Sequence, residues 1–220
     1  MSRLAGVETA SREAMQEKEG KLFVVAAPSG AGKTSLVRAL MQRMPELRFS
    51  ISYTTRKQRQ TERHEHDYFF IDKPTFQRMI DAGDFLEHAQ VFDNFYGTSR
   101  SQVQGVLDAG QNVLLEIDWQ GAQQIRRTMP QSQSIFILPP SRAELERRLR
   151  DRKTDSDEVI ARRLRDSIAD MSHWNEFDYV VVNDDFERAV GDLQTIVEGR
   201  GDELRRDRSG LETSIRSLLG

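Results

Sequence analysis

Apolar residues along this chain gather in short, uninterrupted runs. The runs cover residues 22–27, 112–118, 134–138 and 179–182. Runs of this kind are typical of strands that a parallel sheet buries on both faces. Longer stretches with apolar residues at helical spacing alternate with these runs, at 34–44, 157–171 and 186–199. Residues 119–130 would form the crossover between the strands at 112–118 and 134–138. The alternation predicts an α/β fold, a parallel sheet with helices on both faces.

Two stretches interrupt the alternation and divide the chain into parts. Residues 49–100 predict a compact α+β insert, and residues 141–170 predict a basic helical pair. Within the insert we expect strands at 49–55 and 68–71, a helix at 73–83, and a turn-like segment at 93–99. The other parts are a polar extension (1–20) and a core made of 21–48, 101–140 and 171–220. Ser141 and Glu144 form a capping-box pattern at the start of the helical pair.

Composition narrows the range of functions. The chain has 220 residues, of which 37% are hydrophobic and 30% charged, and its formal net charge is -3. This balance suits a soluble globular protein and gives no reason to expect nucleic acid as a partner. There are no cysteines, which excludes thiol nucleophiles and disulfides. The first twenty residues lack a signal-like apolar core, and no run approaches a membrane span, so we expect a cytoplasmic protein that does not interact with membranes.

The stretch "AAPSGAGKT" indicates a phosphate-binding loop. It fits the pattern G-x-x-x-x-G-K-[ST] except that Ala27 stands at the first glycine, and the required strand and helix flank it. Backbone N–H groups would wrap the phosphates at the start of the helix. The residues expected to bind ATP are Ala27, Pro28, Ser29, Gly30, Ala31, Gly32, Lys33 and Thr34. Thr34 would hold Mg²⁺, and alanine at position 27 is acceptable if its φ is negative.

Arginine clusters indicate which phosphate-loop protein this is. The chain lacks the Asn-Lys-x-Asp motif of a GTPase, and it is too short for the machinery of an ATP-driven motor. Two groups of arginines stand out, Arg56 with Arg59 in the insert, and Arg147, Arg148, Arg150, Arg152, Arg162, Arg163 and Arg165 in the helical pair. Arginines on a mobile element can stabilise a transferring phosphoryl group. We therefore expect a kinase with an anionic acceptor, for which no general base is needed.

Five further motifs make the resemblance specific. "SYTTR", "FLEHAQVFDNFYGTSR", "EIDWQG", "PPS" and "VNDD" follow the phosphate loop in this order. Together they resemble the guanylate kinases of bacterial type, which are phosphate-loop nucleoside monophosphate kinases, from about residue 21 to residue 198. The resemblance implies transfer of the γ-phosphate of ATP to GMP with Mg²⁺. It also implies that residues 49–100 form a GMP-binding subdomain and residues 141–170 a lid.

The resemblance also assigns roles to single residues. Guanine would be held by Ser52, Glu87, Thr98 and Asp118, and the GMP phosphate by Arg56, Arg59, Tyr68 and Tyr96. Catalytic roles would fall to Lys33, Arg59, Arg148, Arg152 and Arg163. Asn183 would lie near the adenosine, and Glu116 would support Mg²⁺ through water. The chemistry agrees, because carboxylates suit the N1–H and 2-amino donors of guanine and hydroxyls suit its O6 acceptor.

This chain departs from the family pattern in the loop after Arg56. The family usually has prolines at positions 58 and 60 and glycines at 61 and 65, where this chain has Gln58, Gln60, Thr61 and Glu65. We expect a more flexible loop there, which affects the placement of Arg59.

Two alternatives stay open at this point. One is a non-catalytic binding module of the same fold, although such a module need not keep Lys33, Thr34 and the arginines of the lid. The other is a related phosphate-loop kinase that acts on a sugar phosphate, against which Glu87 and Asp118 argue. A homo-oligomer is compatible with the sequence.

Overall fold

The computed structural model describes residues 20–91, 93–151 and 157–219. Its core is a five-stranded parallel sheet in the order β2-β7-β1-β8-β9. The strands are β1 (Leu22–Ala26), β2 (Arg48–Phe49), β7 (Val113–Glu116), β8 (Gln133–Leu138) and β9 (Tyr179–Val182). The α/β fold predicted from the alternating apolar runs is confirmed.

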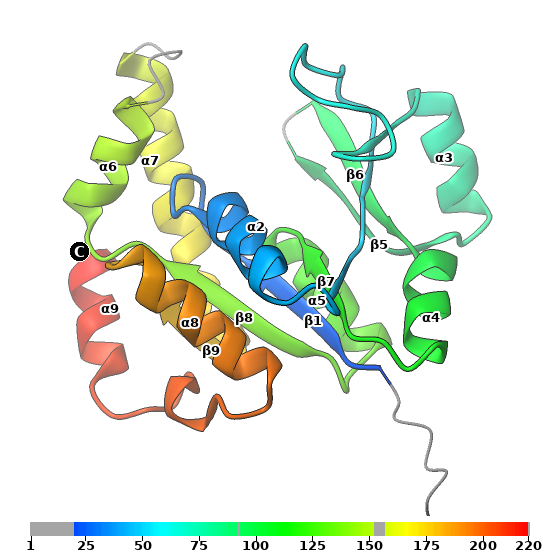
Figure 1. Ribbon diagram of the computed structural model, residues 1–220. Helices are drawn as coiled ribbons and strands as arrows, with labels where there is room; N and C mark the ends of the chain where they lie inside the picture. Colours follow the sequence, from blue (N-terminus) through cyan, green and yellow to red (C-terminus); the bar gives the residue numbers. More distant parts are fainter. Residues whose placement is uncertain (1–19, 92, 152–156, 220) are drawn as a thin grey trace, which may run out of the picture.

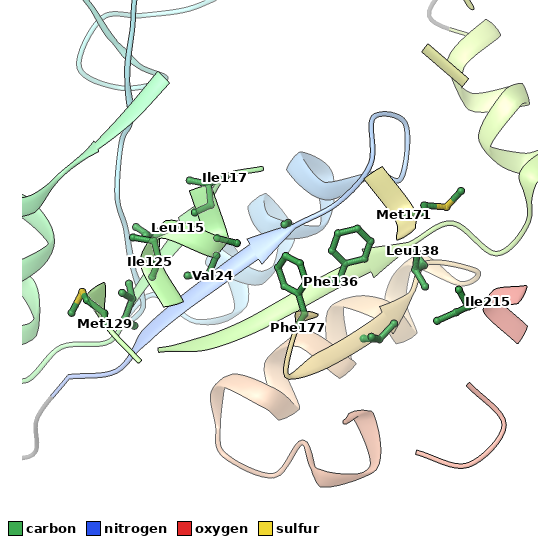
Figure 2. Close-up of a cluster of buried hydrophobic side chains, with 14 of the residues drawn as sticks. Val24, Leu115, Ile117, Ile125, Met129, Phe136, Leu138, Met171, Phe177 and Ile215 are labelled. Carbon is green, nitrogen blue, oxygen red and sulfur yellow. The ribbon is translucent and has the colours of Figure 1, made fainter. Parts of the chain in front are cut away.

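Helices cover both faces of this sheet. One face is covered by α2 (Lys33–Arg43) and α8 (Phe186–Val197), and the other by α4 (Arg100–Asp108), α5 (Trp119–Thr128) and α9 (Leu211–Leu219). Along β1, Phe23 packs with the first set and Val24 with the second, as the two-residue period of a strand requires. Figure 2 draws side chains of the second layer, among them Val24, Leu115 and Ile125.

A second sheet forms the insert. Its four strands have the order β4-β3-β6-β5, with bounds β3 (Tyr53–Thr54), β4 (Phe69–Phe70), β5 (Phe85–Val91) and β6 (Asn94–Ser99), and α3 (Lys73–Asp81) lies beside them. Asp72 begins α3 by accepting a hydrogen bond from the Thr75 N–H at 2.8 Å. Most pairs are antiparallel, while β3 and β4 run parallel.

Two predictions for the insert were wrong. The strand expected at 49–55 is split, because β2 pairs with β7 in the core while β3 pairs with β6 in the insert. The turn expected at 93–99 is largely the strand β6, which pairs with β5 from Val91 opposite Asn94 to Phe85 opposite Ser99. Asn, Gly and Ser weaken a strand pattern, and here the hairpin partner outweighs that preference.

The basic helical pair consists of α6 (Arg142–Arg150) and α7 (Asp157–Met171), followed by the short helix η1 (Ser172–Glu176). Ser141 caps α6 by accepting from the Glu144 N–H at 3.1 Å. The Glu144 side chain instead binds Arg147 and Arg148, so only half of the expected capping box forms. Figure 1 shows α6 with α7 and the insert rising from the same end of the core, on opposite sides of α2.

The C-terminal residues pack on the core. A short helix η2 (Asp202–Leu204) precedes α9, whose Leu211, Ile215 and Leu218 are buried. These three apolar residues, which lie at helical spacing, therefore form an internal packing face. Within the described ranges, none of the helices is both long and apolar enough to cross a bilayer. The predicted extension 1–20 lies outside the described residues except for Gly20.

Candidate active site

The predicted phosphate loop joins β1 to α2 at the end of the central sheet. Gly30 and Gly32 have φ values of 89° and 94°, in the left-handed region that favours glycine. A Cβ at Gly32 would lie 2.5 Å from Asn183 Nδ2, and one at Gly30 would lie 2.9 Å from the Leu145 side chain. Both glycines are thus required by backbone conformation and by space. The turn presents the first N–H groups of α2, which is the usual setting of an anion site.

Ala27 fits this loop without strain. Glu65 is the sole non-glycine residue with a positive φ among the described residues, so Ala27 has a negative φ. The condition under which alanine could replace the first glycine is therefore met. The preceding residues Leu22–Ala26 are all buried, and the turn begins after them.

Two side chains of the loop reach the neighbouring strand β7. Lys33 Nζ donates to the Ile117 carbonyl at 2.7 Å, and the Thr34 hydroxyl donates to Glu116 Oε1 at 2.5 Å. A hydroxyl and a carboxylate are oxygen ligands of the kind that Mg²⁺ prefers, directly or through water. Within the described ranges, no cluster of three or more His, Cys, Asp or Glu forms an alternative metal site.

Side chains from the helical pair and that of Asn183, the residue after β9, cover the loop. Arg148 donates to the carbonyl oxygens of Ala31 at 3.3 Å and Asn183 at 3.1 Å, and Asn183 Nδ2 donates to Ala31 at 2.7 Å. The Ser167 hydroxyl of α7 donates to the Ser29 carbonyl at 3.0 Å. Arg148 was predicted as a catalytic arginine and Asn183 as a residue near the adenosine, and the structure brings both into contact with Ala31.

The carboxyl of Glu87 is buried where the insert meets the core. It is only 3% exposed, and the Thr98 hydroxyl donates to Glu87 Oε1 at 2.6 Å. Burial raises its pKa to about 7, and the Asp118 charge adds to the shift, while the Thr98 hydrogen bond and the Lys33 charge oppose it. Asp118 begins α5 by accepting from the Gly121 N–H at 2.8 Å. The predicted guanine carboxylates and the phosphate-loop lysine thus belong to one electrostatic cluster.

A second charged group lies in the insert around Arg56. Its guanidinium binds Glu62 through two hydrogen bonds of 3.0 and 2.8 Å, and it stacks over the Tyr68 ring at 5.3 Å. The Tyr68 and Tyr96 rings meet edge to face at 6.0 Å. The hydrogen bond from Arg56 lowers the pKa of Glu62, so this carboxylate is an anion seated between cationic and N–H donors. Three of the four residues predicted to hold the GMP phosphate therefore lie together.

The remaining predicted residues lie in the insert and the helical pair. Arg59 is exposed, and its backbone N–H donates to Glu62 Oε2 at 2.9 Å. Ser52 lies between β2 and β3, where its carbonyl accepts from the Phe69 N–H at 2.9 Å. Arg163 lies on α7, and Arg152 lies outside the described residues.

Three residues of this region were not predicted. Glu62 binds Arg56, Glu144 binds Arg148 at 2.7 Å, and Gln124 binds the backbone of His88. The four-residue spacing of Glu144 and Arg148 on a helix could have revealed their pair. Nothing comparable marks Gln124, whose partner is a backbone segment of another element.

Comparisons with known proteins agree with this geometry. The family model described as guanylate kinase matches residues 19–200. The guanylate kinase of Alkalilimnicola ehrlichii is 53% identical over 91% of this chain and 99% of its own length. The guanylate kinase of Escherichia coli O157:H7 is 50% identical over 91% of this chain and 98% of its own length.

A solved structure extends the agreement to the fold. The crystal structure of guanylate kinase from Anaplasma phagocytophilum superposes with a TM-score of 0.70, at 33% identity, and the match covers 91% of this chain and 95% of that one. The phosphate loop, the buried carboxyl of Glu87 and the match over most of the length lead to one conclusion. The chain belongs to the guanylate kinase family.

Proposed function

We propose that this protein transfers the γ-phosphoryl group of ATP to GMP, giving ADP and GDP. The observation that carries the proposal is the buried carboxyl of Glu87, which shares an electrostatic cluster with Asp118 and with Lys33 of the phosphate loop. This cluster joins a group suited to recognise guanine with a group suited to bind ATP. Family membership supports the same reaction.

ATP would bind to residues 27–34, with the adenosine near Asn183. The hydrogen bond from Lys33 to the Ile117 carbonyl holds the ammonium group beside the loop, from where it can move to the β- and γ-phosphates. Thr34 and Glu116 would hold Mg²⁺, directly and through water respectively. The ion would supply neutralisation of phosphate charge.

Guanine would be recognised by Glu87 and Asp118 through its N1–H and 2-amino donors, and by Ser52 and Thr98 through O6. Adenine lacks both donors, so it would leave the buried Glu87 carboxylate without a donor from the base. Sites of this kind discriminate by up to about 10⁴–10⁵. The GMP phosphate would bind Arg56, Arg59, Tyr68 and Tyr96, and it would have to compete with Glu62 for the guanidinium of Arg56.

The transferring phosphoryl group would be stabilised by Lys33, Arg59, Arg148, Arg152 and Arg163. Arg148 already contacts the phosphate loop through Ala31, which supports its role there. The acceptor phosphate carries an oxyanion, so no general base has to remove a proton before attack. The chain's own residues therefore contribute positioning, charge stabilisation and exclusion of water.

The domain scheme belongs to the same proposal. Residues 49–100 would bind GMP, residues 141–170 would close over ATP, and the three core segments would hold the phosphate loop. We further propose a cytoplasmic enzyme whose partners are its two nucleotide substrates.

An ADP-release assay with several acceptors tests the proposal. We expect activity with GMP and little with AMP, CMP or UMP. Glu87→Gln should raise the KM for GMP by about 10²-fold, since a neutral amide replaces a charged acceptor, and leave the KM for ATP within about twofold. Binding of GMP without ADP release would instead favour a non-catalytic binding module. Equal losses for both nucleotides in Glu87→Gln would refute the guanine role of Glu87.

A further inference from the structure

The side chain of Gln124 bridges the core and the insert. It lies on α5, and its amide makes two hydrogen bonds to the backbone of His88 on β5. Nε2 donates to the His88 carbonyl at 2.7 Å, and Oε1 accepts from the His88 N–H at 3.1 Å. The amide therefore pairs with β5 in the way that a neighbouring strand would.

The position of β5 explains why this pairing is available. β5 is an edge strand of the four-stranded sheet, so one of its sides has no strand partner. Edge strands present N–H and C=O groups that need other partners. A primary amide offers a donor and an acceptor side by side, so Gln124 satisfies both groups of His88 at once.

The bridged residue directly follows Glu87. Pairing between β5 and β6 is irregular between Phe85 and Glu87, and from Glu87 onward it is regular, with Thr98 opposite Glu87 and its hydroxyl bound to one carboxylate oxygen. A Cβ placed on Gly121 would lie 2.6 Å from Glu87 Oε2, so the carboxylate packs directly on α5. Gly121 and Gln124 are three residues apart and share a helix face. One face of α5 therefore holds both the backbone and the carboxylate of this part of β5.

We propose that Gln124 is a positioning residue for acceptor selectivity, which holds β5 against α5 so that the Glu87 carboxylate faces the guanine edge beside Asp118. The inference rests on the proposed role of Glu87 in binding GMP. Gln124 itself touches neither nucleotide in this scheme. Its loss should affect GMP binding and leave the phosphate loop, and hence ATP binding, intact.

Gln124→Leu and Gln124→Glu test the inference. Leucine removes both hydrogen bonds at similar volume, and glutamate keeps the acceptor but sets a carboxylate against the His88 carbonyl. We expect each to raise the KM for GMP about tenfold, with the KM for ATP within about twofold. The preference for GMP over IMP, which lacks the 2-amino donor, should decrease. A misplaced carboxylate no longer accepts a hydrogen bond from the 2-amino group, so GMP loses its advantage in binding.

Gln123→Leu is the matched control. Gln123 directly precedes Gln124 on α5 and is also half-buried. Its amide, however, donates to Glu176 at 2.8 Å rather than to β5. We expect this variant to keep the KM for GMP and the preference over IMP. Calorimetric GMP binding and thermal unfolding of all variants separate loss of fold from loss of selectivity.

Each outcome decides a different point. If Gln124→Leu and Gln124→Glu keep wild-type GMP binding and GMP-over-IMP preference, the inference is wrong. It is also wrong if they lower ATP and GMP binding equally, which would make Gln124 merely structural. Should Glu87→Gln lose GMP selectively while the Gln124 variants do not, the proposed function stands and the inference fails. Should the wild type not prefer GMP, the proposed function itself fails.

Discussion

Glu87 carries a free-energy cost that depends on pH. Burial raises its pKa from 4.5 to about 7 in the folded protein, whereas the unfolded chain keeps the ordinary value. Between these pH values the folded state binds more protons than the unfolded state, so the free energy of unfolding falls as pH rises. The full difference, reached above pH 7, is about 3 kcal/mol at most.

Glu87→Gln should remove this dependence. We expect urea unfolding to show similar stabilities for wild type and variant near pH 5, and a variant more stable by up to about 3 kcal/mol near pH 8. The amide oxygen can still accept the Thr98 hydrogen bond, so the comparison isolates the charge. If the free energies of unfolding of wild type and variant differ by a constant amount across this pH range, the pKa of the buried carboxyl is not raised by folding.

Glu65 carries backbone strain in the loop after Arg56. Its φ is 62°, in the left-handed region that favours glycine. A side chain in the left-handed region costs about 1–2 kcal/mol, part of which the greater freedom of unfolded glycine offsets. Glu65→Gly should therefore stabilise the protein by about 0.5–1 kcal/mol in urea unfolding. Glu65→Ala is the control, since a gain of equal size there would assign the effect to the carboxylate instead.

Residues were predictable where chemistry depends on local sequence. The tolerance of Ala27 followed from the strand before the loop, because a negative φ needs no glycine. Gln124 and Glu62 were not predictable, because each acts through a partner whose proximity depends on folding. Gln124 binds a backbone segment 36 residues away, and no residue-type pattern marks such a contact.

Helices and strands were predictable where their apolar residues follow a clear pattern of burial. The strand at 179–182 was predicted with the bounds that β9 has, and α7 likewise matches 157–171. The stretch 49–55 reads as one strand but serves two sheets, since Phe49 pairs with Leu114 and Tyr53 with Gly97. Composition cannot show that a strand changes sheets, because both halves have the same preference for extended backbone.

The terminal helix α9 should contribute strongly to stability. Ile215 is 1% exposed and packs in the cluster that includes Leu138, beside which Figure 2 shows it. Ile215→Ala should lower the free energy of unfolding by about 2–4 kcal/mol, as buried aliphatic truncations do. The exposed Thr213 on the same helix is the control, and its alanine variant should stay within about 0.5 kcal/mol of wild type. Equally small effects for both would mean that α9 does not belong to the cooperative core.

Several contacts join the base of the helical pair to the core, and one of them is an aromatic stack. Trp119, the first residue of α5, stacks on His173 of η1 with ring centroids 3.6 Å apart and an angle of 9°, and its Nε1 donates to Asp170 at 3.0 Å. His173 Nδ1 lies 2.6 Å from Glu176 Oε1. Because α7 ends here, the stack is one place about which α6 and α7 would pivot if they close over the phosphate loop.

His173→Ala should weaken that pivot and reduce turnover more than binding. Arginines that act on the transferring phosphoryl group lower the barrier without binding the ground state, so their misplacement lowers kcat. We expect a fall in kcat of about tenfold, with both KM values within about twofold. Trp174→Phe leaves Trp119 as the only tryptophan, so a red shift of its emission in the double variant would report loss of the stack.

The position of Trp119 makes the opposite result equally informative. Trp119 directly follows Asp118, one of the proposed guanine carboxylates, so the stack could instead steady the acceptor pocket. In that case His173→Ala would raise the KM for GMP and keep kcat, which would contradict the role assigned to the pivot. The exposed His66 supplies the control, since His66→Ala removes a histidine far along the chain from the stack and should change neither constant. The ratio of the change in kcat to the change in KM for GMP thus decides whether the stack positions the proposed lid or the proposed guanine site.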